Sequence, residues 1–195
     1  MECRIALALA SISHLRIPMS TDFEFMTGIT RDFFARKMIK ETLGTISDLD
    51  ISGWEKWIQI EFAKFCKTHS EISEWGRELR YALDRRSSKL KATCAIDFMI
   101  KQKFKQSPLA VEIKQLRSPR GCINSMLRDK AKISRIKYSE DDLRGIWCIG
   151  VHNAATVESV ENLVSFCARE NKIAINPNHV FSRQIGRTPF SVTLF

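Results

Sequence analysis

Three charged residues interrupt two short apolar segments near the middle of the chain. Asp97 lies in the run Thr-Cys-Ala-Ile-Asp-Phe-Met-Ile at 93–100, and Glu112 and Lys114 lie in Leu-Ala-Val-Glu-Ile-Lys at 109–114. A carboxylate inside an apolar strand costs free energy unless a cation, a metal ion or a hydrogen-bond donor meets it. Glu112 and Lys114 alone would also suit a half-buried strand with a solvated ion pair. Together with Asp97 they are the first candidates for an active site.

A third carboxylate, Glu61, lies on the apolar stripe of a predicted helix, seven residues after Trp54. Earlier in this helix, Ser52-Gly-Trp-Glu55 has the form of a capping box, so a contact with the helix start explains Glu55. Glu61 has no such explanation. Either it forms a buried ion pair with an arginine, or it points toward the same site as Asp97.

The elements that must position these residues follow from periodicity and helix-capping signals. Alternation in a strand over 93–100 would place Ile96 and Phe98 on the face opposite to Asp97. Ser118-Pro119 predicts the start of a helix, because Pro is favoured at the first helical position. The other predicted elements are a helix over 30–43 with Thr30 as its N-cap and Gly44 as its stop, strands over 76–84, 109–114 and 146–151, a helix from Thr156, and short strands at 172–175 and 190–195.

This order of elements resembles the PD-(D/E)XK nuclease superfamily. The matching residues are Asp97 on the second core strand, Glu112-Ile113-Lys114 on the third, and Glu61 in the preceding helix, within residues 50–152. Position 96 is Ile, where the family name expects Pro. The resemblance implies an α/β, restriction endonuclease-like fold: a three-layer α/β/α core with a mixed central sheet flanked by helices, plus an N-terminal helical extension.

The chemistry of such a site would need a divalent metal ion. Mg²⁺ or Mn²⁺ prefers hard oxygen ligands such as the carboxylates of Asp97 and Glu112. The resemblance implies that the backbone carbonyl of Ile113 completes this ligand set, and that Glu61 binds a second ion or a water. Lys114 would orient or help deprotonate the attacking water and offset charge in the transition state. The resulting prediction is a Mg²⁺-dependent phosphodiesterase, with DNA endonuclease activity favoured.

The charge balance favours a polyanionic partner. The chain has 31 Lys and Arg against 22 Asp and Glu, a formal charge of +9. Neutralising phosphates releases counterions and so drives binding to nucleic acid. DNA is favoured over RNA as the partner, and basic segments at 85–91 and 101–105 would flank the site. The residues predicted to bind nucleic acid are Arg85, Arg86, Lys89, Arg117, Arg120 and Arg128.

Length and composition predict one globular domain, with an N-terminal extension and packing helix at 1–45 and the nuclease-like part at 46–195. The apolar stretch at 4–12 is too short to span a membrane. Translation could start at Met1 or Met19. Six scattered cysteines without a Cys-x-x-Cys pair favour a reduced, cytoplasmic compartment over a zinc site. A homodimer is left open.

Two other classes of function stay open at this point. A nuclease-like fold without activity could serve to bind nucleic acid or a protein partner. A structural or regulatory protein could instead use its basic surface to meet an acidic protein. Metal-dependent cleavage separates the first prediction from both alternatives, and salt-dependent binding of nucleic acid separates the alternatives from each other.

Overall fold

The computed structural model describes residues 21–82, 93–136 and 143–195. The six described strands form one sheet in the order β1-β2-β3-β4-β6-β5. β3 and β4 are parallel, and all other neighbouring strands are antiparallel. In chain order the elements are α1 (Asp22–Ala35), α2 (Lys37–Asp48), α3 (Glu55–Thr68), β1 (Ile72–Ala82), β2 (Thr93–Gln102), β3 (Leu109–Gln115), α4 (Pro119–Ile133), β4 (Gly145–Asn153), α5 (Val157–Glu170), the short 3₁₀ helix η1 (Pro177–His179), β5 (Phe181–Gln184) and β6 (Phe190–Leu194).

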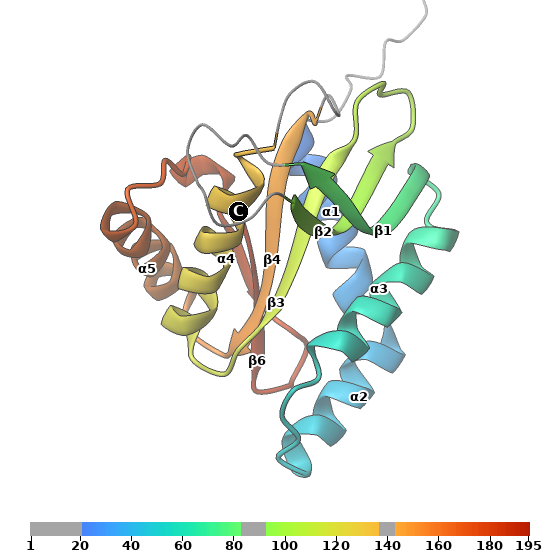
Figure 1. Ribbon diagram of the computed structural model, residues 1–195. Helices are drawn as coiled ribbons and strands as arrows, with labels where there is room; N and C mark the ends of the chain where they lie inside the picture. Colours follow the sequence, from blue (N-terminus) through green and yellow to red (C-terminus); the bar gives the residue numbers. More distant parts are fainter. Residues whose placement is uncertain (1–20, 83–92, 137–142) are drawn as a thin grey trace, which may run out of the picture.

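Helices cover both faces of this sheet (Figure 1). Alternate residues of β3 and β4, such as Val111 and Ile149, pack in one core with α1, α2 and α3. Cys148 faces the other way and packs with α4 and α5. The chain is therefore an α/β protein with a mixed six-stranded sheet between helices, and this part of the prediction is confirmed.

The helix predicted to start at Thr30 and stop at Gly44 is wrong in its limits. Thr21 caps α1, because its hydroxyl accepts from the Glu24 amide at 3.2 Å and the Glu24 carboxylate accepts from the Thr21 amide at 2.7 Å. Arg36 has extended backbone and separates α1 from α2. Thr30 is buried inside α1, and Gly44 lies inside α2.

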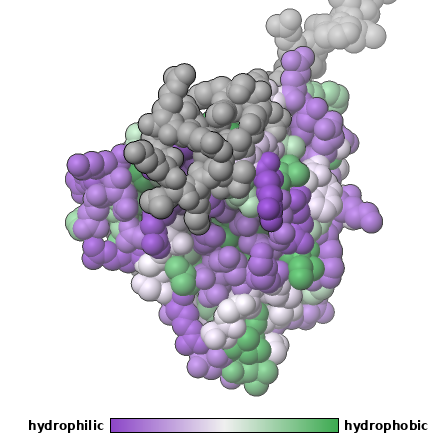
Figure 2. Space-filling model, in the orientation of Figure 1, coloured by the Kyte–Doolittle hydropathy of each residue, from purple (hydrophilic) through white to green (hydrophobic). Residues whose placement is uncertain are grey.

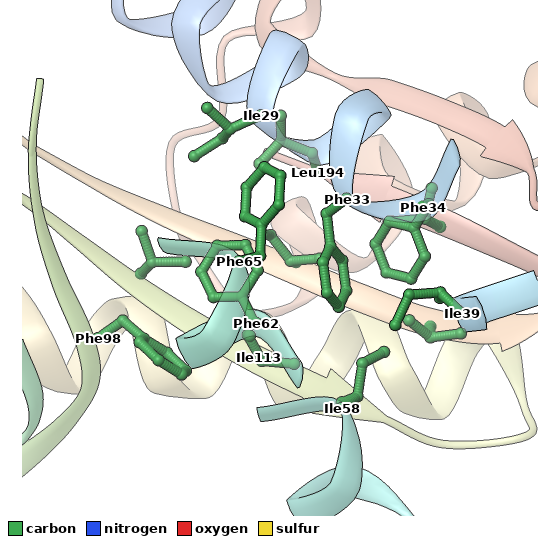
Figure 3. Close-up of a cluster of buried hydrophobic side chains, with 14 of the residues drawn as sticks. Ile29, Phe33, Phe34, Ile39, Ile58, Phe62, Phe65, Phe98, Ile113 and Leu194 are labelled. Carbon is green, nitrogen blue, oxygen red and sulfur yellow. The ribbon is translucent and has the colours of Figure 1, made fainter. Parts of the chain in front are cut away.

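Aromatic side chains tie the N-terminal helices to the rest of the core (Figure 3). The Phe33 ring of α1 lies 5.2 Å from Phe62 and 5.6 Å from Phe65, both on α3. Phe62 in turn meets Phe98 of β2 at 5.0 Å. The helices before α3 thus share one hydrophobic cluster with the sheet, and the boundary predicted at residue 45 falls within α2.

Among the later elements, the start of α4 is confirmed and one predicted strand is wrong. The Ser118 hydroxyl accepts from the Gly121 amide at 3.2 Å, with Pro119 as the first helical residue. The segment 172–175 is not a strand but an irregular connection. Its apolar residues Ile173 and Ile175 are partly buried against the cluster under α5, which accounts for the apolar pattern. One edge of the sheet is instead formed by β5, beside β6, and alternation did not predict this strand.

The surface and the helix lengths give no sign of a membrane span in the described residues. The face drawn in Figure 2 is mostly hydrophilic, with separate apolar patches. The longest described helix, α4, has 15 residues, whereas a span takes about 20 apolar residues. None of the described helices is long and apolar enough to cross a bilayer.

Candidate active site

The candidate site lies where strands β2 and β3 separate. Their ladder pairs Phe98 with Val111 and goes no further toward Asp97. Each of the next two carboxylates bonds the backbone of the other strand instead. Glu112 Oε1 accepts from the Asp97 amide at 3.2 Å, and Asp97 Oδ2 accepts from the Ile113 amide at 3.0 Å. These crossed hydrogen bonds replace the ladder and hold both carboxylates at the opening between the strands.

β2 changes its packing partners at Asp97. Phe98 belongs to the core under α1, α2 and α3, whereas Ile96 packs with Ile133 of α4. The prediction that Ile96 and Phe98 share a face is therefore wrong. Opposite Asp97 in register, Glu78 of β1 has a φ of 51°, which is uncommon for a residue other than glycine. Neither the β1–β2 ladder nor the β2–β3 ladder pairs Asp97, so both ladders are interrupted at the residue that carries the carboxylate.

Lys114 lies beside these carboxylates and is surrounded by acidic groups. Its Nζ is 3.0 Å from Asp129 Oδ2 and 3.9 Å from Glu112 Oε2. Glu55 Oε1 lies 3.9 Å from the same amine. The lysine side chain is 19% exposed, so these charges interact with little screening by water. With Asp97 included, the cluster has more negative than positive charge.

Glu55 and Asp129 were not predicted to belong to the site. The capping box assigned to Ser52 and Glu55 is wrong, because Trp54 is the N-cap of α3 and no side-chain bond caps the helix. Glu55 Oε2 instead accepts from the Gln115 amide at 3.0 Å, which ties the start of α3 to the end of β3. Asp129 had a sequence signal that was not used, since it is the one acidic residue of an otherwise basic helix.

The structure does not bring Glu61 into this cluster. Glu61 Oε1 lies 2.7 Å from Lys64 Nζ, one turn further along α3. The other oxygen, Oε2, is buried without a hydrogen-bond partner in the described residues. Glu61 is also absent from the charges that shift the pKa of Glu112 and Lys114. Glu61 is buried, as predicted, but its partner is a lysine of its own helix. The residue that α3 contributes to the cluster is Glu55.

Two pKa shifts describe the electrostatics of the cluster. Burial, reinforced by the charges of Asp97 and Asp129, raises the pKa of Glu112 to about 8, and Lys114 offsets part of this rise. Burial alone would lower the pKa of Lys114, but the hydrogen bond and charge of Asp129, aided by Glu55, raise it overall. Lys114 therefore stays protonated at neutral pH, while Glu112 holds its proton unless another cation approaches.

The donor atoms fit a hard divalent cation, although the described residues contain no group of three or more His, Cys, Asp or Glu side chains arranged to hold a metal ion. Mg²⁺ usually takes one or two protein carboxylates and keeps several waters, a set that Asp97 and Glu112 can supply. A buried carboxylate repelled by its neighbours is where added positive charge is most favourable. The backbone amide of Ile113 holds Asp97 in place, and the predicted role of its carbonyl stays a prediction.

The arginines predicted to bind nucleic acid differ in their surroundings. Arg117 forms an ion pair with Asp50, and Arg120 donates two hydrogen bonds to Glu170 at 3.0 and 3.2 Å. Arg128 is exposed and bonds only the backbone of its own helix among the contacts seen for it in the described residues. Their role in binding phosphate stays a prediction. The other three predicted residues, Arg85, Arg86 and Lys89, lie outside the described residues.

The site is thus assembled from two strands and two helices at one opening in the sheet. β2 and β3 contribute the two crossed carboxylates and the lysine, and the first residue of α3 and one residue of α4 bracket that lysine. No family model, curated protein or solved structure matches this chain.

Proposed function

We propose that this protein is a metal-dependent nuclease that hydrolyses phosphodiester bonds, with DNA as the favoured substrate and internal cleavage as the favoured mode. The observation that carries the proposal is the crossed pair of hydrogen bonds in which Glu112 accepts from the Asp97 amide and Asp97 accepts from the Ile113 amide. Lys114 Nζ lies 3.9 Å from Glu112 Oε2. Two carboxylates on adjacent strands can hold a divalent cation beside a protonated amine. Both positive groups would act on the same negatively charged phosphodiester.

The arrangement of elements supports a restriction endonuclease-like fold of the PD-(D/E)XK superfamily. Asp97 is on β2, and Glu112-Ile113-Lys114 is on the antiparallel neighbour β3. α4 then connects β3 to the parallel strand β4, so that a helix crosses the face that carries the site. Under this proposal α1 and α2 are the N-terminal helical extension.

Each residue of the cluster has a distinct part in the proposed reaction. Asp97 and Glu112 would hold Mg²⁺ or Mn²⁺, which when bound supplies Lewis-acid stabilisation of charge on the phosphodiester. Lys114 stays protonated because Asp129 raises its pKa, so we assign it to binding phosphate oxygens and orienting water, not to accepting a proton. Asp129 and Glu55 position that amine from opposite sides.

Cleavage of defined substrates tests this proposal directly. Purified protein is incubated with supercoiled plasmid, linear duplex, single-stranded DNA and single-stranded RNA, in Mg²⁺, in Mn²⁺ and in excess chelator. We expect cleavage of DNA in the presence of either metal and none in chelator, with nicked plasmid as the mark of internal cleavage. Protein that leaves all four substrates intact with both metals would rule the proposal out.

A nucleic-acid binding module without catalysis is the second candidate function. It is favoured by the way Lys114 is already satisfied, since it lies within 4 Å of three carboxylates: 3.0 Å from Asp129 and 3.9 Å from both Glu55 and Glu112. A site closed by its own ion pairs would need no metal. Binding of DNA that weakens with salt, with no cleavage and no change of melting temperature on adding Mg²⁺, would favour this candidate over the nuclease.

Glu55 and Glu61 give a matched pair of substitutions within one helix. We expect Glu55→Gln to lower Mg²⁺-dependent cleavage about 10-fold to 100-fold, because Glu55 positions Lys114 and residues that position the groups of a metal site from outside it have effects of that order. Glu61→Gln should change cleavage less than about threefold, since Glu61 bonds Lys64 and not the site. Initial rates at saturating Mg²⁺ measure both. The opposite ranking would return Glu61 to the site and remove Glu55 from it.

A further inference from the structure

One aromatic side chain stands almost entirely in solvent. Phe104, in the turn between β2 and β3, is 94% exposed, more than any other exposed large hydrophobic residue in the described part of the chain. Lys103 and Lys105 flank it in the sequence. In Figure 1 this turn is the yellow-green loop that projects at the upper edge of the molecule. Leaving a phenyl ring in water forgoes the stabilisation that burial would give.

The backbone conformation of Phe104 adds a second cost to the free energy of folding. The Lys105 amide donates to the Gln102 carbonyl at 3.1 Å, so Phe104 is the third residue of a four-residue turn. Its φ is 64°. A positive φ at this position of a turn is the place for Gly or Asn, and a bulky residue there is strained. Neither the exposure of this ring nor the strain of its backbone stabilises the fold. A role in function therefore explains the presence of Phe104 better than a role in stability does.

The turn is nevertheless held firmly to the sheet. The Lys103 amide donates to the Glu71 carbonyl at 2.9 Å, just before β1 begins. The Ser73 hydroxyl donates to the Lys101 carbonyl at 3.1 Å, and the Lys101 amine pairs with Glu74 at 3.0 Å. Phe104 is therefore presented from a fixed hairpin end, so little conformational entropy is lost when the ring binds a partner.

We propose that Phe104 is a base-stacking wedge for nucleic acid, with Lys103 and Lys105 contacting the phosphates on either side. Phenyl rings stack on bases or insert between base steps, and lysines beside them meet the backbone. The proposal takes its ligand from the proposed function, but it concerns binding and not cleavage. The five residues of β2 that follow Asp97, 98–102, separate it from the turn that carries Phe104. They span roughly 17 Å in a strand, or about five nucleotides along one strand of DNA.

The substitution Phe104→Gly separates binding from folding. Glycine accepts the positive φ without strain, so the melting temperature should be unchanged or higher than that of the wild type. Affinity for single-stranded and duplex DNA, measured by fluorescence anisotropy in chelator, should fall about tenfold, because stacking of one base is worth a change of that order. Phe104→Trp should keep the affinity, and the control Met38→Ala, on an exposed helical surface, should leave it unchanged.

Salt dependence distinguishes the ring from the lysines. Phe104→Gly should weaken binding equally at all salt concentrations, whereas Lys103→Gln and Lys105→Gln should each reduce the slope of log affinity against log salt by about one. A 2-aminopurine base in the DNA should be quenched by the wild type and not by Phe104→Gly. Unchanged affinity for DNA and unchanged quenching in Phe104→Gly would overturn the proposal. A lower melting temperature of Phe104→Gly would also overturn it, because the ring would then stabilise the fold. So would a variant that binds DNA like the wild type but no longer binds anionic phospholipid vesicles.

The wedge and the nuclease can fail separately. If the wild type cleaves nothing but Phe104→Gly loses affinity and quenching, the nuclease proposal fails and the wedge stands. If the wild type cleaves DNA with Mg²⁺ and Phe104→Gly binds and cleaves as well as the wild type, the wedge fails and the nuclease stands.

Discussion

Asp97→Asn and Glu112→Gln should each lower Mg²⁺-dependent cleavage of DNA by about a hundredfold to a thousandfold, because each removes a charged oxygen ligand from the proposed metal site. Effects of that size are typical when one group that stabilises transition-state charge is lost. Both substitutions keep a side-chain oxygen that can accept the crossed hydrogen bonds, from the Ile113 amide and from the Asp97 amide. The strand opening should therefore survive while the metal affinity falls.

The same two variants need a control that changes a carboxylate elsewhere. Glu41→Gln serves this purpose, since Glu41 forms an exposed ion pair with Lys37 in α2, and exposed pairs contribute little to stability. It should cleave like the wild type. Circular dichroism and melting curves check that all three variants are folded. Cleavage by Asp97→Asn within about twofold of the wild type, at saturating Mg²⁺, would show that the crossed carboxylates are not the metal site.

Residues 93–114 could be interpreted from the sequence because a charge inside an apolar run is a conflict that any fold must resolve. Asp97 and Glu112 resolve it locally, by bonding backbone amides that the separating strands leave free. The alternation rule failed at the same point. It assumes a regular ladder, and the interruption of that ladder at Asp97 places Ile96 and Phe98 in different clusters.

The sequence predicted that Glu61 belongs to the site, but Glu55 is the residue of α3 that lies in the cluster. This difference shows what a local motif cannot reveal. Ser52-Gly-Trp-Glu55 has the spacing of a capping box, but a cap also requires the backbone of residue 52 to sit at the helix start, and α3 begins with Trp54 as its N-cap. Glu55 is then free to accept from Gln115, which is 60 residues away in the chain. A contact of that range depends on how α3 docks against β3, and no pattern within α3 contains that information.

The N-terminal helices show the same limit of local motifs, here in the choice between two possible helix starts. Thr21 and Glu24 form a capping box of the kind sought at Ser52, yet the apolar spacing after Thr30 suggested a later start. Thr30 is buried in the structure, so a residue type that often caps a helix is here a small core residue. Which of two capping signals is used depends on the tertiary packing of Phe33 against α3.

The unfolding free energy of the metal-free protein should fall as pH rises from about 4.5 to about 8, because of Glu112. Burial raises the pKa of this carboxyl from 4.5 to about 8, so in that range the folded protein binds a proton that the unfolded chain has released. Stability then decreases with pH. With the side chain 4% exposed, the loss should be on the order of a few kcal/mol.

Glu112→Gln isolates this contribution, since glutamine cannot titrate. Urea unfolding in chelator should find the variant as stable as the wild type near pH 4.5 and a few kcal/mol more stable near pH 9, in line with the raised pKa. Mg²⁺ should reverse the order at pH 9, because it binds the ionised wild-type site and stabilises the folded state in proportion to its occupancy. A difference between variant and wild type that does not depend on pH would mean that Glu112 is not a buried, repelled carboxyl. A pH-dependent difference that Mg²⁺ leaves unchanged would mean that the repulsion exists but that no metal ion relieves it, which would favour the binding module over the nuclease.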